Sequence, residues 1–184
     1  MDSIAKEPIQ ISMPAISRIL RCLSIAALAC CNGRRLTAAV DTSTEHTRHN
    51  SKATSRRNIE EHYDLGNNFY RLWLDPTMTY SSARFTKSKQ TLEEAQRSKY
   101  EALCEKLQLK ESDHVLEIGC GWGGFSCHAA ENHGCRVTAV TISQAQFDEA
   151  TRHVRQAGLE DRIEIRLQDY RDITGQFDKI ASIE

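Results

Sequence analysis

Two hydrophobic periods alternate through the second half of the chain. Short apolar runs predict β-strands, and they span residues 114–118, 135–141, 162–167 and 178–183. Apolar residues at helical spacing predict helices over residues 123–132 and 143–157, the second ending at Gly158. Strands and helices that alternate with short connections form a parallel sheet with right-handed crossovers. We therefore expect an α/β fold with a partial sheet of four strands.

Helices are also predicted ahead of this sheet. Between residues 56 and 74, apolar and aromatic side chains recur at near-helical spacing, which indicates one or two helices. Thr91 and Glu94 have the spacing of a capping box, and Leu103 and Leu107 fall on one side of the helix that follows. We expect that helix to lie against the sheet.

The first 55 residues have a different character from the rest. The formal charge is about +5 over residues 1–57 and about −6 over residues 58–184. We interpret residues 1–55 as a basic, poorly ordered N-terminal arm and linker, ahead of a domain at residues 56–184. A basic arm can contact an anionic membrane surface, and a solvated terminus is the alternative.

Two other functions of the arm are disfavoured. The uninterrupted apolar part of residues 16–31 is only about ten residues long, too short to span a bilayer. We therefore expect residues 16–31 to form an amphipathic or ill-ordered helix. Nucleic acid binding is not expected, because the arm lacks aromatic residues among its basic ones and the chain's pI is near neutral.

The seven cysteines form no Cys-x-x-Cys pair. We interpret them as reduced thiols of a cytoplasmic protein. Cys127, His128, His133 and Cys135 have side chains that can ligate zinc, but their spacing fits no common structural site. We therefore expect buried thiols and no metal ion.

The strongest chemical signal is the glycine-rich turn that follows the first predicted strand. Gly119, Gly121 and Gly123 permit positive φ angles and let a ligand approach bare backbone, and Glu117 stands just before them. NAD and S-adenosylmethionine (SAM) enzymes share such turns. In a dinucleotide site, an acidic or basic residue follows the second strand. Residues 141–144 here contain neither, which favours a SAM-type cofactor held by hydroxyls, amides and Glu117.

The carboxyl ends of three predicted strands should form one binding site. In open parallel sheets, ligands bind outside these ends. Residues 117–123, 141–146 and 168–170 all fall there. We therefore expect Gln168 and Asp169 to face the glycine turn.

Eight short motifs occur in one order along the chain. They lie at residues 62–67, 72–75, 78–81, 91–93, 95–96, 119–124, 140–143 and 167–172. Together they closely resemble the cyclopropane-fatty-acyl-phospholipid synthase family, which includes the mycolic acid cyclopropane synthases and related fatty-acid C-methyltransferases. The resemblance covers roughly residues 55–184.

The resemblance implies a Rossmann-like class I SAM-dependent methyltransferase. Its implied reaction transfers a methyl group to the cis double bond of an unsaturated phospholipid acyl chain and closes a cyclopropane ring. A bound bicarbonate removes the proton in related enzymes. The implied location is the cytoplasm, with peripheral contact at the inner face of the membrane left open by the basic arm.

The resemblance and the strand ends together give the expected site residues. The cofactor-binding set is Tyr80, Ser81, Glu117, Gly119, Cys120, Gly121, Gly123, Thr141, Ser143, Gln146, Gln168, Asp169 and Tyr170. In the family, Tyr80 and Ser81 match positions at the methionine end of SAM, and Asp169 matches one at the adenine. The catalytic candidates are Tyr63, beside the substrate, and Ser82, which matches a backbone contributor to the bicarbonate site.

The family's remaining bicarbonate ligands would fall beyond Glu184. We therefore interpret the sequence as a fragment of a longer catalytic domain, and expect weak SAM binding without turnover. Three alternatives stay open: a fatty-acid C-methyltransferase with a methyl-branched product, an N-methyltransferase of small amines, and a SAM-binding module without activity.

Overall fold

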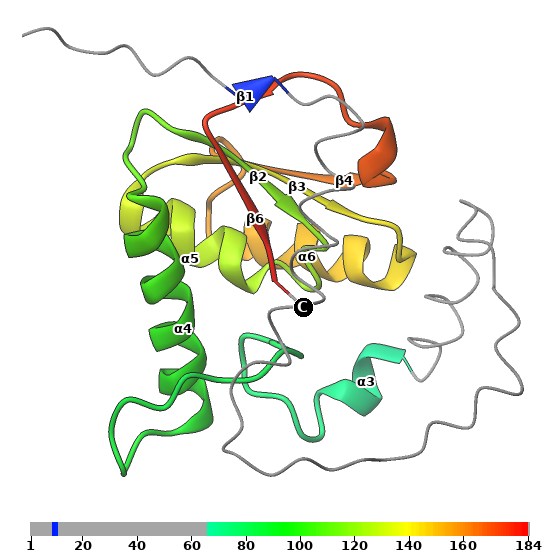
Figure 1. Cartoon of the computed structure of the whole chain (residues 1–184). Helices are drawn as coiled ribbons and strands as arrows, with labels where there is room; N and C mark the ends of the chain where they lie inside the picture. Colours follow the sequence, from blue (N-terminus) through cyan, green and yellow to red (C-terminus); the bar gives the residue numbers. More distant parts are fainter. Residues whose placement is uncertain (1–8, 11–65, 184) are drawn as a thin grey trace, which may run out of the picture.

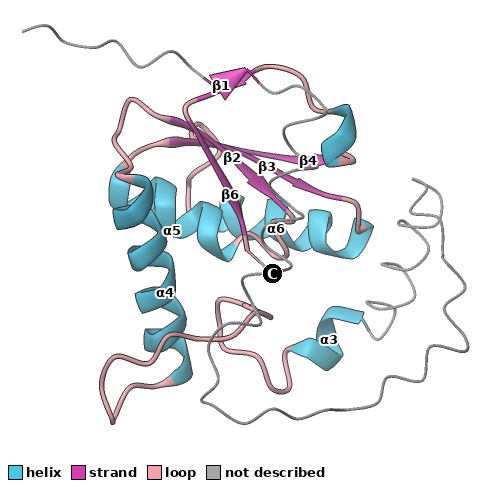
Figure 2. Cartoon of the chain, in the orientation of Figure 1, coloured by secondary structure: helices cyan, strands magenta, loops and turns pink. Residues whose placement is uncertain are grey.

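A four-stranded parallel sheet forms the centre of the molecule. The computed structural model describes residues 9–10 and 66–183. The strand order is β4-β3-β2-β6, so each new strand is added outside the previous one until β6 returns to the other side of β2. The four strands are β2 (His114–Ile118), β3 (Arg136–Thr141), β4 (Ile163–Leu167) and β6 (Lys179–Ser182). All four predicted strands are confirmed (Figure 2).

Two crossover helices cover one face of this sheet. They are α5 (Gly124–His133) and α6 (Gln144–Gln156), and both lie on the same side in Figure 1. The strands alternate as a half-buried pleat requires: Val115 and Val137 pack toward the helices, in a core that includes Phe125. The predicted helices are thus confirmed, although α6 ends at Gln156, two residues before Gly158.

The predicted capping box opens a third helix, α4 (Leu92–Leu107). Glu94 donates its backbone N–H to Thr91 Oγ1 over 3.2 Å, and the Glu94 carboxylate accepts from the Thr91 N–H over 2.8 Å. The helix packs against α5 with Tyr100 and Cys104 and extends past the sheet (Figure 1). The main contact of α4 is therefore α5, rather than the sheet itself as expected.

The opposite face of the sheet carries a smaller core. Leu116, Ile118 and Val140 pack there against Ile173 and Phe177. These last two residues belong to the link between β4 and β6, which holds a 3-10 helix, η2 (Tyr170–Asp172), and a short strand, β5 (Gln176–Phe177). Strand β5 pairs antiparallel with β1 (Ile9–Gln10). Neither strand was expected from the sequence.

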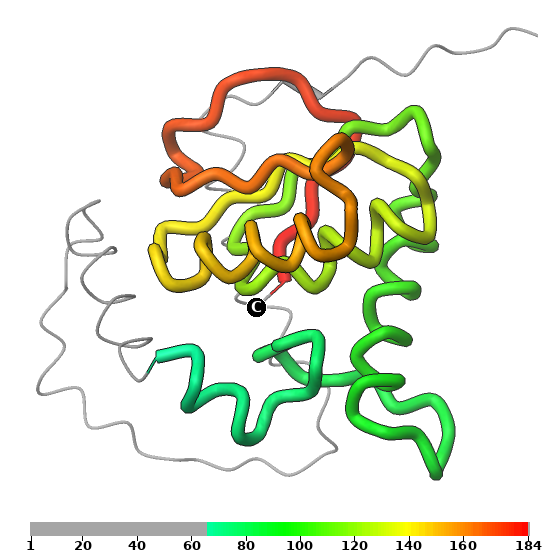
Figure 3. The backbone as a smooth tube through the Cα atoms, turned by 180° about the vertical axis from the view of Figure 1, so that it is seen from behind, coloured from blue at the N-terminus to red at the C-terminus, as the bar shows by residue number. Residues whose placement is uncertain are grey.

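Of residues 56–74, where one or two helices were predicted, the structure describes residues 66–74, and part of these are helical. Only α3 (Gly66–Tyr70) forms, followed by turns, and residues 56–65 lie outside the described residues. The helix and its turns lie beyond the carboxyl ends of the strands (Figures 1 and 3). This segment therefore stands over the end of the sheet where a ligand was expected.

Two further expectations concern the described residues. Cys104, Cys120 and Cys135 are buried and Cys127 is partly buried, all four as free thiols. The other three cysteines lie outside the described part. Among the described residues, no helix combines the length and apolar character needed to cross a bilayer.

Candidate functional site

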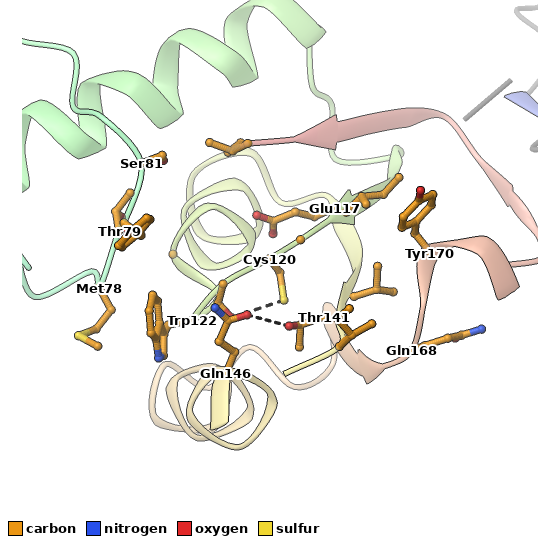
Figure 4. A pocket seen from close by; sticks show the side chains of 18 of the residues that line it. Met78, Thr79, Ser81, Glu117, Cys120, Trp122, Thr141, Gln146, Gln168 and Tyr170 are labelled. Atoms are coloured by element: carbon orange, nitrogen blue, oxygen red, sulfur yellow. Dashed lines mark hydrogen bonds between the residues drawn. The ribbon is translucent and has the colours of Figure 1, made fainter. Parts of the chain in front are cut away.

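A cavity of about 350 Å³ opens at the carboxyl ends of β2 and β3. Its size is within the range of small-molecule sites. The residues that line it include Met78, Thr79, Tyr80, Ser81, Glu117, Ile118, Gly119, Cys120, Gly121, Trp122, Thr141, Ile142, Gln146, Gln168, Asp169, Tyr170 and Arg171. Figure 4 shows side chains from all three predicted segments, and from the loop before α4, around one space.

The glycine turn gives this cavity a wall of bare backbone. The N–H groups of Gly119 and Cys120 both donate to the Val140 carbonyl over 3.0 Å, which ties the turn to the end of β3. Gly121 has a φ of 53°, in the left-handed region that favours glycine. A side chain atom added there would meet open space rather than protein, so the backbone faces the cavity.

Glu117 places a carboxyl group beneath this turn. Its side chain is only 2% exposed and accepts a short hydrogen bond from the Ser126 hydroxyl of α5. Burial raises the pKa of the Glu117 carboxyl from 4.5 to about 7, and the bond from Ser126 opposes that rise. The group therefore changes charge near neutral pH.

The end of β3 supplies a hydroxyl and an amide. Thr141 Oγ1 donates to Gln146 Oε1 over 2.8 Å and accepts the Ser143 N–H over 3.2 Å. Ser143 instead caps α6, where its Oγ accepts the Gln146 N–H over 3.3 Å. Ser143 is not among the residues that line the cavity.

The end of β4 presents Gln168, Asp169 and Tyr170. Arg171 Nε donates to Asp169 Oδ1 over 2.8 Å, and Arg171 Nη2 donates to Asp169 Oδ2 over 2.5 Å. A carboxylate can accept further hydrogen bonds beyond such a fork. The two bonds from Arg171 thus hold the Asp169 carboxylate in place at the cavity wall.

The loop before α4 forms the remaining wall. Gln96 Nε2 donates to the Ser81 carbonyl over 2.8 Å, and Lys99 Nζ donates to Ser81 Oγ over 2.7 Å. Tyr80 is 45% exposed, and its ring packs edge-on against Tyr70 and Trp73, with ring centroids 5.9 and 5.8 Å away. Helix α4 therefore fixes the loop backbone, and neighbouring aromatic rings orient Tyr80.

Helix α3 is tied to the same site. Trp122 Nε1 donates to Asn67 Oδ1 over 2.8 Å, and Asn67 Nδ2 donates to the Ala145 carbonyl over 3.2 Å. The Arg71 guanidinium pairs with the buried carboxylate of Glu149 on α6. These contacts join α3 to the glycine turn and to α6.

Four predicted site residues fall outside this cavity lining. Gly123 and Ser143 begin α5 and α6 as cap residues, and Ser82 follows the lining residue Ser81 without joining it. Tyr63 lies outside the described residues. The other eleven predicted residues line the cavity.

Sequence reasoning missed several lining residues. Met78 and Thr79 belong to a family motif but had no predicted role, and Trp122 stands among the predicted glycines. Arg171, two residues after Asp169, could have been found as its ion-pair partner. Nothing in the local sequence pattern indicated that Lys99 would reach Ser81.

Comparison with known proteins gives consistent matches. Residues 50–184 match the family described as mycolic acid cyclopropane synthetase. The cyclopropane-fatty-acyl-phospholipid synthase of Escherichia coli (strain K12) is 48% identical over 124 residues, 67% of this chain and 31% of the relative. A probable fatty acid methyltransferase of Pseudomonas putida is 41% identical over 138 residues, 74% of this chain and 35% of the relative.

A solved structure matches in fold as well. Mycolic acid cyclopropane synthase CmaA1, complexed with SAH and CTAB, superposes with a TM-score of 0.67 at 34% identity, over 70% of this chain and 45% of that one. This match confirms the predicted Rossmann-like α/β fold. The chain spans about a third of the length of these two curated relatives.

Proposed function

The chain belongs to the mycolic acid cyclopropane synthetase family, and from this premise we propose that it is the cofactor-binding part of a SAM-dependent methyltransferase. Its fold is that of the class I SAM-dependent methyltransferases. The proposed reaction transfers a methyl group to the cis double bond of an unsaturated phospholipid acyl chain and forms a cyclopropane ring. The observation that carries the proposal is the cavity at the strand ends.

The groups in the cavity fit SAM. SAM combines an amino-acid end, a ribose, an adenine and a sulfonium cation. The backbone of Gly119 and Gly121 leaves room for close approach, and the hydroxyl of Thr141 and the amide of Gln146 can bond a ribose. The segment after β3 lacks the charged residue of a dinucleotide site, which favours SAM over NAD.

The two ends of the cavity would hold the two ends of SAM. Asp169 would accept a hydrogen bond from the adenine and Gln168 would donate one to it, beside the ring of Tyr170. Tyr80 and Ser81 would lie at the methionine end, as the family resemblance implies. The arginine fork on Asp169 supports this assignment, because it holds the carboxylate in a fixed orientation.

When bound, SAM supplies an electrophilic methyl group that the π electrons of a cis double bond can attack. The face of the Tyr80 ring would attract the sulfonium by roughly 0.5–2 kcal/mol without offering a nucleophile. Glu117 would shift toward its ionised form beside a bound cation. These residues thus bind and orient the donor and leave the acceptor to be the nucleophile.

The substrate class is supported by exposed apolar side chains near the cavity. Leu72 and Trp73, in the turns after α3, are 80% and 49% exposed, and Phe69 on α3 is 41% exposed. Trp73 contacts Tyr80, which lines the cavity. An acyl chain could bury this surface on its way to the methyl donor.

Bicarbonate has no step in the proposed mechanism. Ser82 lies outside the cavity lining. We therefore assign no proton-removal step to the described residues. Membrane contact through the basic arm also stays a prediction.

The test is a methyl-transfer assay with the protein encoded by the complete gene. It is incubated with SAM carrying a labelled methyl group and vesicles of a cis-unsaturated phospholipid, and the acyl chains are analysed by mass spectrometry. We expect label in acyl chains that have gained a cyclopropane ring. A labelled methyl branch would favour the C-methyltransferase alternative, since the P. putida relative is named a fatty acid methyltransferase. Label found in added small amines but not in lipid would contradict the proposed function.

A further inference from the structure

Four metal-binding side chains meet between α4 and α5, away from the cofactor cavity. Glu101 and Cys104 come from α4, and His128 and His133 come from α5. One ligand atom from each of Cys104, His128 and His133 lies within 4.8 Å of the others. The Glu101 carboxylate lies 2.9 Å from His128 Nε2 and 3.3 Å from His133 Nε2. None of the four residues lines the cofactor cavity.

We propose that Glu101, Cys104, His128 and His133 form a binding site for one divalent zinc ion. Thiolate, imidazole and carboxylate are the three ligand types that zinc prefers, and four ligands complete its usual tetrahedron. The site goes beyond the proposed methyl transfer and does not depend on it.

Two of the separations between donor atoms fit this geometry. With zinc bonds of about 2.0–2.1 Å to nitrogen and oxygen, neighbouring ligand atoms in a tetrahedron lie about 3.3 Å apart, and the longer zinc–sulfur bond widens this slightly. The two carboxylate–imidazole distances, 2.9 and 3.3 Å, are close to that edge. The ligand atoms of Cys104, His128 and His133 lie within 4.8 Å of one another, so these side chains must move closer together to reach this edge when the ion binds.

Burial and hydrogen bonding favour the site on balance. The Glu101 carboxylate is hydrogen-bonded to Nε2 of both His128 and His133, which orients it toward the two imidazoles. Cys104 is fully buried, and zinc binding must expel its thiol proton, as it does at other zinc–thiolate sites.

The zinc ion would have a structural role. It would cross-link the second half of α4 to α5, while Gln96 and Lys99, earlier in α4, hold Ser81 of the cofactor cavity. In the sequence, Cys127 and Cys135 are the nearest companions of the two histidines, and their spacing predicts no metal ion. Helix packing instead brings Cys104 to these histidines from a distant part of the chain.

The test measures metal binding by the full chain, in reduced form and free of metal. Zn²⁺ affinity is measured by competition with a chromophoric chelator, and Co²⁺ replaces it as a spectroscopic probe. We expect one Zn²⁺ per chain and, with Co²⁺, the visible bands of a tetrahedral site and a thiolate charge-transfer band. Thermal unfolding should shift upward with Zn²⁺, because the ion binds only the folded site.

The variants separate this site from other thiols and histidines. Cys104→Ser should abolish the charge-transfer band, and Glu101→Gln and His133→Gln should each weaken Zn²⁺ binding at least about tenfold. Glu101 is 43% exposed, so its variant should fold. Cys127→Ser on α5 and His114→Gln on β2 are matched controls that should bind as the parent does. A chain without zinc affinity, or one whose band survives Cys104→Ser, would show that the cluster is only a hydrogen-bond network.

Discussion

At the scale of single residues, Glu117 makes the clearest link between burial and pH. Its carboxyl titrates near 7 in the folded chain and near 4.5 when exposed, so the folded state binds more protons between these values. Stability from this group is therefore present at low pH and is lost as the pH rises from about 4.5 to about 7. The loss amounts to about 3 kcal/mol.

Glu117→Gln should remove this pH dependence. The amide can still accept from Ser126 but cannot ionise. The parent should lose up to about 3 kcal/mol of unfolding free energy between pH 5 and pH 8 through this group, and the variant should not. The stability of the variant minus that of the parent should therefore rise by this amount from pH 5 to pH 8. Urea unfolding at both pH values measures the difference, and Glu160→Gln, at an exposed acid, serves as the control. Equal differences at the two pH values would contradict the burial of an ionisable group here.

Gly124 is required by close packing rather than by its backbone angles. A side-chain carbon there would lie 2.6 Å from the Tyr100 hydroxyl and 3.0 Å from the Thr77 carbonyl. Gly124→Ala should therefore cost about 1–3 kcal/mol of stability, although alanine favours a helix by up to about 1 kcal/mol. Chemical denaturation measures the loss.

A double-mutant cycle identifies the cause of that loss. In the Tyr100→Phe background the nearer contact is gone, so Gly124→Ala should cost less than in the parent. An equal cost in both backgrounds would place the strain elsewhere.

Residue type and spacing predicted some of the site residues. The roles of the others depend on the residues that they contact in the fold. The glycines and Glu117 were recognisable because their spacing after an apolar run has few other uses. Ser143 was expected to face the cofactor, but a serine at the start of a helix also caps it, and the cap is its role here. The Lys99 contact with Ser81 spans two elements, so no local pattern could reveal it.

At the scale of elements, the start of α4 can be tested directly. Thr91→Ala removes the hydroxyl that accepts the Glu94 N–H. We expect a loss of about 0.5–2 kcal/mol in unfolding free energy. Thr174→Ala, at an exposed loop position, should change stability by less than about 0.5 kcal/mol. If Thr91→Ala lowers the unfolding free energy no more than Thr174→Ala does, the capping box contributes little to stability.

Long periodic elements were predictable and short ones were not. The sheet strands and the helices α4, α5 and α6 each offer enough residues for a hydrophobic period to be detected. Strands β1 and β5 have two residues each, and their pairing joins distant parts of the chain. Within the described residues 66–74, helix α3 ends at Tyr70 and turns follow, because aromatic residues from both the helix and the turns pack on Tyr80.

At the scale of the whole molecule, topology brings the site together. The order β4-β3-β2-β6 places the ends of β2 and β3 side by side, with α3 and the loop before α4 across from them. Parallel strands joined by crossovers have their carboxyl ends at one edge of the sheet, so the sequence could predict where the cavity would form. The aromatic wall around Tyr80 comes from segments outside the sheet, and only the family resemblance pointed to it.

The most direct test of the cavity's role is titration calorimetry of the chain with SAM and with SAH, which lacks the sulfonium charge. Our account predicts one SAM site, and Tyr80→Ala should weaken SAM binding roughly 2- to 30-fold while affecting SAH less, because the ring face attracts only the cation. Phe85→Ala, at an exposed aromatic residue outside the cavity, should leave both affinities unchanged. Failure to bind SAM, or binding of a nicotinamide dinucleotide in its place, would contradict the account.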